Sequence, residues 1–153
     1  MRKLKLYIDT SIIGGYFDDE FEIETKQLFN KVLQNEYDIV LSDITARELL
    51  GAPDNVKKLL QDLKIEYELL NTTNEVNILA EAYLNENVVG ETSKDDCLHI
   101  AIATINKIDI LVSWNFKHIV NIKRIRGYNS VNLKNGYATL EIRSPKDLID
   151  HEK

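Results

Sequence analysis

Short hydrophobic runs along the chain predict five β-strands. The first, KLKLYI at residues 3–8, alternates at its start and ends in an apolar run, which is typical of a strand entering a buried sheet. Four further runs have the length and composition of strands, and Ser144-Pro145 stops the last of them. These four runs are residues 38–41, 65–70, 108–113 and 138–142.

Between these runs, apolar residues recur three and four positions apart, which is the spacing of one face of an amphipathic helix. Helices of this kind are predicted within residues 24–35, 56–63, 76–83 and 98–105. Thr72 with Glu75 three residues later has the pattern of a capping box and predicts the start of the third helix. Ser93 with Asp96 opens the fourth helix in a similar way.

Strands that alternate with helices predict an α/β fold in which a mostly parallel sheet is covered on both faces. The chain has 153 residues with only two prolines and six glycines and shows no internal repeat, so we expect a single domain over residues 1–153. In such sheets ligands bind beyond the carboxyl ends of the strands. The candidate chemistry is therefore carried by polar residues near those ends.

Two candidates follow strands. Asp9 comes directly after the first strand in YIDTS, where a buried carboxylate is costly unless it is paired or holds a metal. Asp is also a favoured N-cap, here for a helix beginning near Ser11, so both interpretations stay open. Asn115 follows the fourth strand in VSWNF, where Asn is most often a turn residue, although its amide oxygen also suits a cation or a water.

Two further acids lie on helices that reach the same edge. Glu48, in the buried helix SDITARELL, would on its own be expected to face solvent and pair with Arg47 or a lysine. Asp95 and Asp96 both suit the first turn of a helix, whose dipole favours negative charge. Successive helix positions point about 100° apart. Asp96 lies one turn before the buried Ile100, so we expect Asp96 to be the acid that faces inward.

Three carboxylates and one amide at one sheet edge offer only oxygen ligands, which suit Mg²⁺ or Mn²⁺. His99, His118, His151 and Cys97 are scattered and give no zinc-binding set. On sequence grounds, His99 is expected to be a hydrogen-bonded helix histidine and Cys97 a core residue.

The charge distribution changes the choice of partner. The formal net charge is −6, which argues against a protein that binds polyanions by bulk charge. Residues 110–140, however, carry five basic side chains and no Asp or Glu. We expect Lys117, Lys123, Arg124 and Arg126, with the aromatic residues Trp114, Phe116 and Tyr128 nearby, to bind single-stranded RNA. The alternative is a solvated helix face with Trp114 and Phe116 in the core.

Targeting features do not point to secretion or to a membrane. Cys97 is the only cysteine, so no intrachain disulfide forms. Asp9 interrupts the N-terminal apolar run too early for a signal peptide, and CLHIAIATI is far shorter than the roughly 20 residues that span a bilayer. We therefore expect a cytoplasmic protein without a membrane partner.

Taken in order, these segments resemble a known family. YIDTS, ARELL, DDCLHIAIAT and ILVSWNFKHI resemble the PIN-domain ribonucleases between Leu4 and about Ile119, and in particular the VapC-type toxins. The closing stretch RGYNSVNLKNGYATLEIRSP resembles the ending of a WN-containing subgroup. The resemblance implies an α/β/α sandwich and a Mg²⁺- or Mn²⁺-dependent hydrolase that cuts RNA and leaves a 5′-phosphate. It also implies a cognate antitoxin and a homodimer.

Carried over position by position, the family's three acids fall on Asp9, Glu48 and Asp96, and a nearby hydroxyl falls on Ser11. The resemblance implies that the three acids bind the metal, with Ser11 and Asn115 completing the catalytic set. The family's fourth acid falls on Asn115, which removes one negative charge and predicts weaker binding of a second metal. The alternative function is a catalytically weak PIN-fold module that acts by binding a protein or an RNA.

Overall fold

Five parallel strands form one sheet at the centre of the protein. A computed structural model describes residues 2–149, so residues 1 and 150–153 of the expected domain lie outside the described part. The strand order is β3-β2-β1-β4-β5, and every neighbouring pair is parallel. The strands are β1 (Leu4–Ile8), β2 (Tyr37–Ser42), β3 (Tyr67–Leu70), β4 (Ile110–Val112) and β5 (Glu141–Arg143). The predicted α/β class is confirmed.

The last strand begins later than its pattern indicates. The sequence predicts residues 138–142, whereas β5 covers Glu141–Arg143. The Asn129 side chain accepts from the Leu140 N–H at 2.7 Å and donates to the Leu140 carbonyl at 3.0 Å. Since both backbone groups of Leu140 are bonded to this side chain, the strand ladder begins one residue further on.

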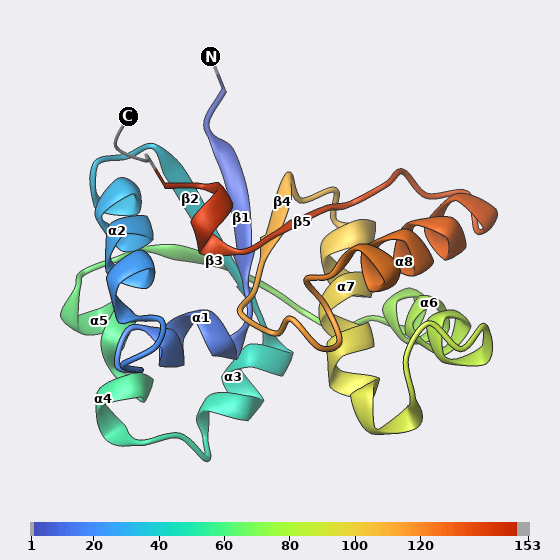
Figure 1. Cartoon of the computed structure of the whole chain (residues 1–153), viewed down its shortest axis with the longest axis horizontal. Helices are drawn as coiled ribbons and strands as arrows, with labels where there is room; N and C mark the ends of the chain where they lie inside the picture. The colour runs from blue at the N-terminus through green and yellow to red at the C-terminus, as the bar shows by residue number, and fades with distance from the viewer. Residues whose placement is uncertain (1, 150–153) are drawn as a thin grey trace.

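Helices cover both faces of the sheet, which makes the expected α/β/α sandwich. In Figure 1, α1, α2, α4 and α5 lie on one side of the sheet, and α6, α7 and α8 lie on the other. Their bounds are α1 (Thr10–Gly15), α2 (Glu22–Leu33), α3 (Asp43–Leu49), α4 (Asp54–Lys57), α5 (Leu59–Asp62), α6 (Asn74–Asn85), α7 (Lys94–Ile105) and α8 (Ile122–Lys134). Two 3₁₀ turns, η1 (Glu91–Ser93) and η2 (Pro145–Asp147), complete the described elements.

Helix starts differ from the sequence prediction at two threonines. The side chain of Thr73, and not that of Thr72, caps α6 by accepting from the Val76 N–H at 3.3 Å. Thr72 instead donates its hydroxyl to Asp43 at 2.8 Å and so ties the end of β3 to the start of α3. The predicted capping box was therefore wrong by one residue, because a tertiary partner was available to the first threonine.

Two other predicted helices also depart from their patterns. The helix expected over residues 56–63 is divided into α4 and α5 at Lys58, although its apolar residues Val56, Leu59 and Leu60 are buried as the spacing indicates. Ser93 lies at the N-cap of α7 as expected, but its side chain makes no capping hydrogen bond. No helix within residues 2–149 combines the length and the apolar character needed to cross a membrane.

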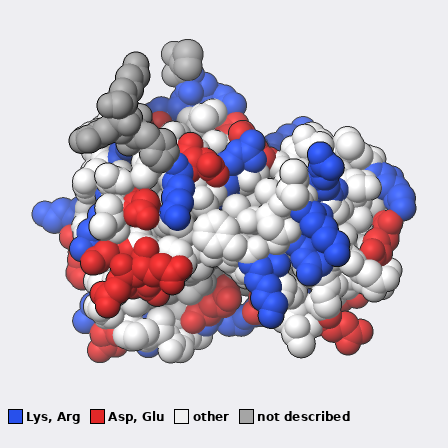
Figure 2. All heavy atoms as spheres, in the orientation of Figure 1, with Lys and Arg blue, Asp and Glu red and all other residues white. Residues whose placement is uncertain are grey.

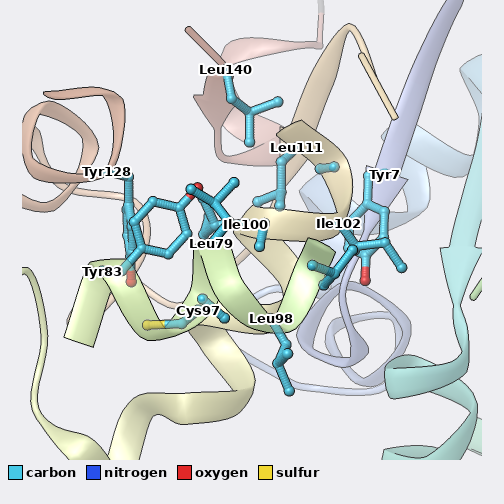
Figure 3. Packing of buried hydrophobic residues seen from close by; sticks show 14 of the residues in the cluster. Tyr7, Leu79, Tyr83, Cys97, Leu98, Ile100, Ile102, Leu111, Tyr128 and Leu140 are labelled. Carbon is cyan, nitrogen blue, oxygen red and sulfur yellow. The ribbon is translucent and has the colours of Figure 1, made fainter. Parts of the chain in front are cut away.

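Alternate residues of β1, β2 and β4 face two separate hydrophobic clusters. Leu6, Ile8, Leu41 and Val112 face the cluster under α1, α2, α4 and α5. Tyr7, Val40, Leu111 and Ile142 face the cluster under α6, α7 and α8. Figure 3 shows the second cluster, with Tyr7 beside Ile102 and with Tyr83 and Tyr128 at the far end. Packing against these two clusters fixes the sheet, and with it the positions of the residues that follow the strands.

Trp114, two residues after the end of β4, links the sheet to the first two helices. It is buried, stacks on Phe21 with ring centroids 4.3 Å apart, and donates its indole N–H to Thr25 Oγ1 at 2.9 Å. Gly15, at the end of α1, lies against the same indole. A Cβ added at Gly15 would lie 2.8 Å from Trp114 Cδ1 and 2.9 Å from Thr25 Oγ1. The close approach of α1 to Trp114 therefore requires a glycine at this position.

We expect Gly15→Ala to destabilise the protein by about 1–3 kcal/mol, because the added methyl overpacks the Trp114 contact. Gly14→Ala is the matched control, since a Cβ at Gly14 meets nothing within 4 Å. That control should be neutral or stabilising by up to about 1 kcal/mol through helix propensity. Urea unfolding of both variants measures the difference, and equal stabilities would contradict the close contact.

Candidate active site

Asp9 lies at the middle of the carboxyl edge of the sheet. The central strand β1 pairs with β2 on one side and with β4 on the other, so the connections diverge at the end of β1. Such a switch point is where open α/β sheets bind ligands. Asp9 is only 5% exposed, and its side chain caps α1 by accepting from the Ile12 N–H at 3.3 Å. The capping interpretation of Asp9 is therefore correct, and the carboxylate also lies at the expected ligand position.

Two serine hydroxyls hold the two oxygens of Asp9. Ser11 Oγ donates to Oδ1 and Ser113 Oγ donates to Oδ2, each at 2.6 Å. The backbone N–H of Trp114 donates to Ser11 Oγ at 2.9 Å, and that of Asn115 donates to Ser113 Oγ at 3.0 Å. Since each serine oxygen already accepts an N–H, its own proton is directed at Asp9. The turn after β4 thus orients Asp9 through both serines.

These donors do not fully compensate for the burial of Asp9. Burial raises the pKa of Asp9 above its usual value, although the interaction with His99 and the hydrogen bonds from Ser11, Ser113 and the Ile12 N–H act in the opposite direction. A cation bound beside this carboxylate would favour its ionised form further.

Glu48 is held by the site and does not pair with the cations near it in sequence. Its Oε1 accepts from Thr10 Oγ1 at 3.0 Å and lies 2.6 Å from His99 Nε2. Arg47 instead pairs with Asp95 at 2.7 Å, so the expectation that Glu48 faces solvent beside Arg47 was wrong. Partial burial opposes ionisation of Glu48, but the hydrogen bonds from His99 and Thr10 outweigh it and lower the pKa of Glu48.

Asp96 faces the other acids, whereas Asp95 lies on the outside of α7. The Asp96 side chain is 21% exposed against 48% for Asp95. Burial, together with the charges of Asp9 and Glu48, raises the pKa of Asp96 to about 6, while His99 and His118 act in the opposite direction. Asp9, Glu48 and Asp96 therefore interact electrostatically across the sheet edge, although they come from three separate segments of the chain.

The amide of Asn115 is turned opposite to the direction expected from the sequence. Its Oδ1 accepts from the backbone N–H of His118 at 2.9 Å, while its Nδ2 donates to Asp96 Oδ1 at 3.4 Å. His118 Nδ1 lies 3.6 Å from the other oxygen of Asp96. Because a backbone N–H can only donate, the amide orientation is unambiguous. Asn115 thus presents a donor to the acids, and its oxygen serves the turn.

Three residues of this edge were not predicted as part of it: Ser113, His99 and His118. His99 is buried and hydrogen-bonded, as expected of a helix histidine, but its partner Glu48 makes it part of the site. Ser113 ends a hydrophobic run and His118 lies within the basic segment, so neither carries a sequence signal of its own. Cys97 is buried in the core, as expected.

The donor set fits a hard divalent cation in chemistry. Within residues 2–149, no three His, Cys, Asp or Glu side chains are close enough together to form a ready-made metal site. The three acids nevertheless offer carboxylate oxygens, and both donors to Glu48 share Oε1, so its Oε2 accepts from none of the described residues. Oxygen ligands suit Mg²⁺ or Mn²⁺ rather than zinc.

The basic segment lies on the same side of the sheet as α7 and α8. Lys117, Lys123 and Arg126 are exposed, and Figure 2 shows Lys and Arg side chains gathered over the half of the molecule that α8 occupies. Arg124 differs, because it is half-buried and donates to the carbonyl oxygen of Val88. The basic surface available to a ligand is therefore formed by Lys117, Lys123 and Arg126.

The aromatic residues near this surface divide between core and solvent. Trp114 and Tyr128 are buried, and Tyr128 donates its hydroxyl to the His118 carbonyl at 2.9 Å. Phe116 is 44% exposed and meets the Trp114 ring edge-to-face. The core interpretation is thus correct for Trp114 and wrong for Phe116, which is the one aromatic of the three that a base could stack on.

We expect Asp96→Asn to stabilise the metal-free protein at pH 7.5 by on the order of 1–3 kcal/mol. The Asp96 pKa is about 6 in the folded protein and about 3.9 when unfolded, so the folded state binds this proton more tightly. The ionised form therefore lowers the free energy of unfolding above pH 6, and the gain from Asn should shrink as pH falls toward 4. Urea unfolding in EDTA at several pH values measures this. Asp95→Asn is the exposed control, and a variant less stable than wild type at pH 7.5 would contradict the account.

Comparison with known proteins supports the fold. No protein-family model and no curated protein match the sequence. One similar chain comes from the crystal structure of Rickettsia felis VapBC2 bound to a DNA fragment from the VapBC2 promoter. That chain is 16% identical to this one, with a TM-score of 0.59. That match covers 92% of this chain and 98% of the other.

Two further solved structures are similar. A chain of a toxin-antitoxin complex from Klebsiella pneumoniae is 20% identical with a TM-score of 0.56, over 78% of this chain and 93% of its own. A chain of the Neisseria gonorrhoeae FitAcB crystal structure is 15% identical with a TM-score of 0.58, over 92% and 98%. Membership of the WN-containing subgroup stays a prediction. At this level of identity the likenesses concern architecture, and the chain has the PIN-like α/β/α fold that its motifs predicted.

Proposed function

We propose that this protein is a divalent-metal-dependent endoribonuclease whose site is formed by Asp9, Glu48 and Asp96. One observation carries the proposal. Three acids meet at the switch point of a PIN-like sheet, and two of them, Asp9 and Asp96, have pKa values raised by burial. A structural role alone would favour neutral side chains at such positions, since buried unpaired charges destabilise a fold.

Each acid has a distinct part in this proposal. Asp9, fixed by Ser11 and Ser113, and Asp96, on the first turn of α7, would hold Mg²⁺ or Mn²⁺. Glu48 would face the same ion through its Oε2. When bound, a divalent cation lowers the pKa of a coordinated water and offsets negative charge on a phosphate. Hydrolysis would join the water oxygen to phosphorus, break the bond to the 3′ oxygen and transfer a proton from the water to that oxygen, which leaves a 3′-hydroxyl and a 5′-phosphate.

The substrate proposal rests on charge and exposure. Lys117, Lys123 and Arg126 are exposed cations on a segment without acids, and Phe116 offers a partly exposed ring. Cations that neutralise phosphates and rings that stack on bases together suit single-stranded RNA. Asn115, which donates to Asp96, directly precedes this segment in the chain.

The partner proposal rests on the similar structures. Chains of the same fold occur in complexes described as VapBC2 and as a toxin-antitoxin pair. We propose that this chain is the toxin of such a pair, with a cognate antitoxin, and that it forms a homodimer in the cytoplasm. The rival function is a binding module with weak catalysis, which the Asn115 donor beside Asp96 favours. RNA binding without cleavage at any Mg²⁺ or Mn²⁺ concentration would support the rival.

We expect the protein to cleave a labelled single-stranded RNA in Mg²⁺ or Mn²⁺ and not in EDTA. Asp9→Asn should lower the rate by about a hundredfold or more, the scale of losing one charge-stabilising group. Asp95→Asn is the matched control, since Asp95 carries the same charge next to Asp96 but pairs with Arg47 on the outside of α7. Cleavage that survives EDTA or the Asp9 variant would refute the assigned site.

The triple variant Lys117→Gln, Lys123→Gln, Arg126→Gln should weaken RNA binding and reduce the slope of log K against log salt by about 2. The control replaces Lys57, Lys58 and Lys64 by Gln, because these exposed lysines give the same change in net charge on the α4–α5 side. Filter binding at a series of salt concentrations measures both slopes. Equal slopes for the two triple variants would remove the basic segment from the RNA-binding surface.

A further inference from the structure

A buried chain of hydrogen bonds behind Glu48 has no part in the reaction described so far. It joins Ser42 at the end of β2, Tyr7 in β1 and His99 in α7 to Glu48 in α3. Tyr7 Oη lies 2.6 Å from Ser42 Oγ and 2.5 Å from His99 Nδ1, and His99 Nε2 lies 2.6 Å from Glu48 Oε1. Ser42, Tyr7 and His99 are all nearly inaccessible to solvent, so each polar atom depends on its partner in the chain.

The direction of the bonds follows from counting donors, beginning at Ser42. Ser42 caps α3, and its Oγ accepts the backbone N–H of Ile44 at 3.2 Å and of Thr45 at 3.4 Å. A hydroxyl has two acceptor positions and one proton. With both acceptor positions used by the helix N-terminus, the proton of Ser42 is left for Tyr7. Ser42 therefore donates to Tyr7 Oη.

Tyr7 passes the direction on to His99. Burial raises the pKa of the Tyr7 phenol above its ordinary value near 10, so Tyr7 keeps its proton at neutral pH. Tyr7 Oη accepts from Ser42, and its other hydrogen-bond partner among the described residues is His99 Nδ1, so the Tyr7 proton is directed there. The edge-to-face contact of the two rings, with centroids 5.6 Å apart, holds this geometry. Nδ1 of His99 is therefore an acceptor, and the ring proton lies on Nε2.

The proton on Nε2 fixes one oxygen of Glu48. His99 Nε2–H and the Thr10 hydroxyl both donate to Oε1, whereas Oε2 accepts from none of the described residues. We propose that His99 is a positioning residue, held by Ser42 and Tyr7 as the Nε2–H tautomer, that turns Oε2 of Glu48 toward the edge shared with Asp9 and Asp96. That Oε2 meets a divalent cation rests on the proposed function, whereas the tautomer does not.

The tautomer is tested first, on the metal-free protein. Long-range ¹H–¹⁵N spectra of protein labelled at histidine distinguish Nε2–H from Nδ1–H, and the resonances missing from His99→Gln identify His99. We expect one neutral tautomer with the proton on Nε2 at pH 7.5. In Tyr7→Phe, which removes the donor to Nδ1, the two tautomers should exchange. A proton on Nδ1 in the wild-type protein, alone or together with one on Nε2, would overturn the proposal.

Binding of Mn²⁺ by calorimetry tests the consequence for Glu48. His99→Leu should weaken binding by about tenfold or more, the usual effect of losing a group that orients a metal ligand. His99→Gln should restore most of the affinity, because a glutamine amide can accept from Tyr7 and donate to Glu48. Equal loss in the Leu and Gln variants, with both folded by circular dichroism, would contradict positioning through a hydrogen bond.

The two tests separate the positioning role from the proposed function. A wild-type protein that binds no Mn²⁺ would refute the metal site, while the tautomer spectrum would still decide how His99 holds Glu48. A wild-type protein that binds Mn²⁺ with an Nδ1–H histidine would refute the positioning role and leave the metal site intact.

Discussion

The constraint on which this structure depends is that three acids share one end of a buried parallel sheet. Asp9 follows the central strand, and its neighbours in the fold keep it almost fully out of water. Burial of a carboxylate is unfavourable, and the nearby charges of Asp9 and Glu48 raise the pKa of Asp96 further. The surroundings of these acids are therefore arranged to orient them without neutralising them.

That orientation comes from two separate sets of hydrogen bonds. The turn after β4 reaches Asp9 through Ser11 and Ser113, with successive backbone N–H groups directing the two hydroxyls. Trp114 in this turn is itself fixed by its stack on Phe21 and its bond to Thr25. On the other side of the sheet, the chain from Ser42 reaches Glu48. The core of each half of the sandwich thus supports a different acid.

Much of this could be predicted from local pattern. The strand periodicities indicate all five strands, and the rule that parallel strands end at one edge predicts that Asp9, Glu48 and Asp96 share that edge. The predictions that were wrong concern contacts between residues far apart in sequence. Glu48 is bonded to His99, 51 residues away, and no spacing rule could select that partner over Arg47. Thr72 lost its predicted capping role to Asp43 for the same reason.

The orientation of a side chain could not be predicted from the sequence either. Asn115 was correctly placed after β4, but its amide oxygen serves the His118 N–H, so its nitrogen faces Asp96. A sequence shows that an amide is present and not which end of it meets the site. The same holds for Ser113, whose hydroxyl is informative only once Asp9 is known to lie beside it.

The central claim is that this sheet edge binds a divalent cation through Asp9, Glu48 and Asp96. Its most direct test is anomalous diffraction from crystals grown with Mn²⁺. We expect an anomalous peak within coordination distance of oxygens from Asp9 and Asp96, with Glu48 Oε2 facing it. Mn²⁺ peaks found only elsewhere on the protein, with this edge empty at saturating metal, would contradict it.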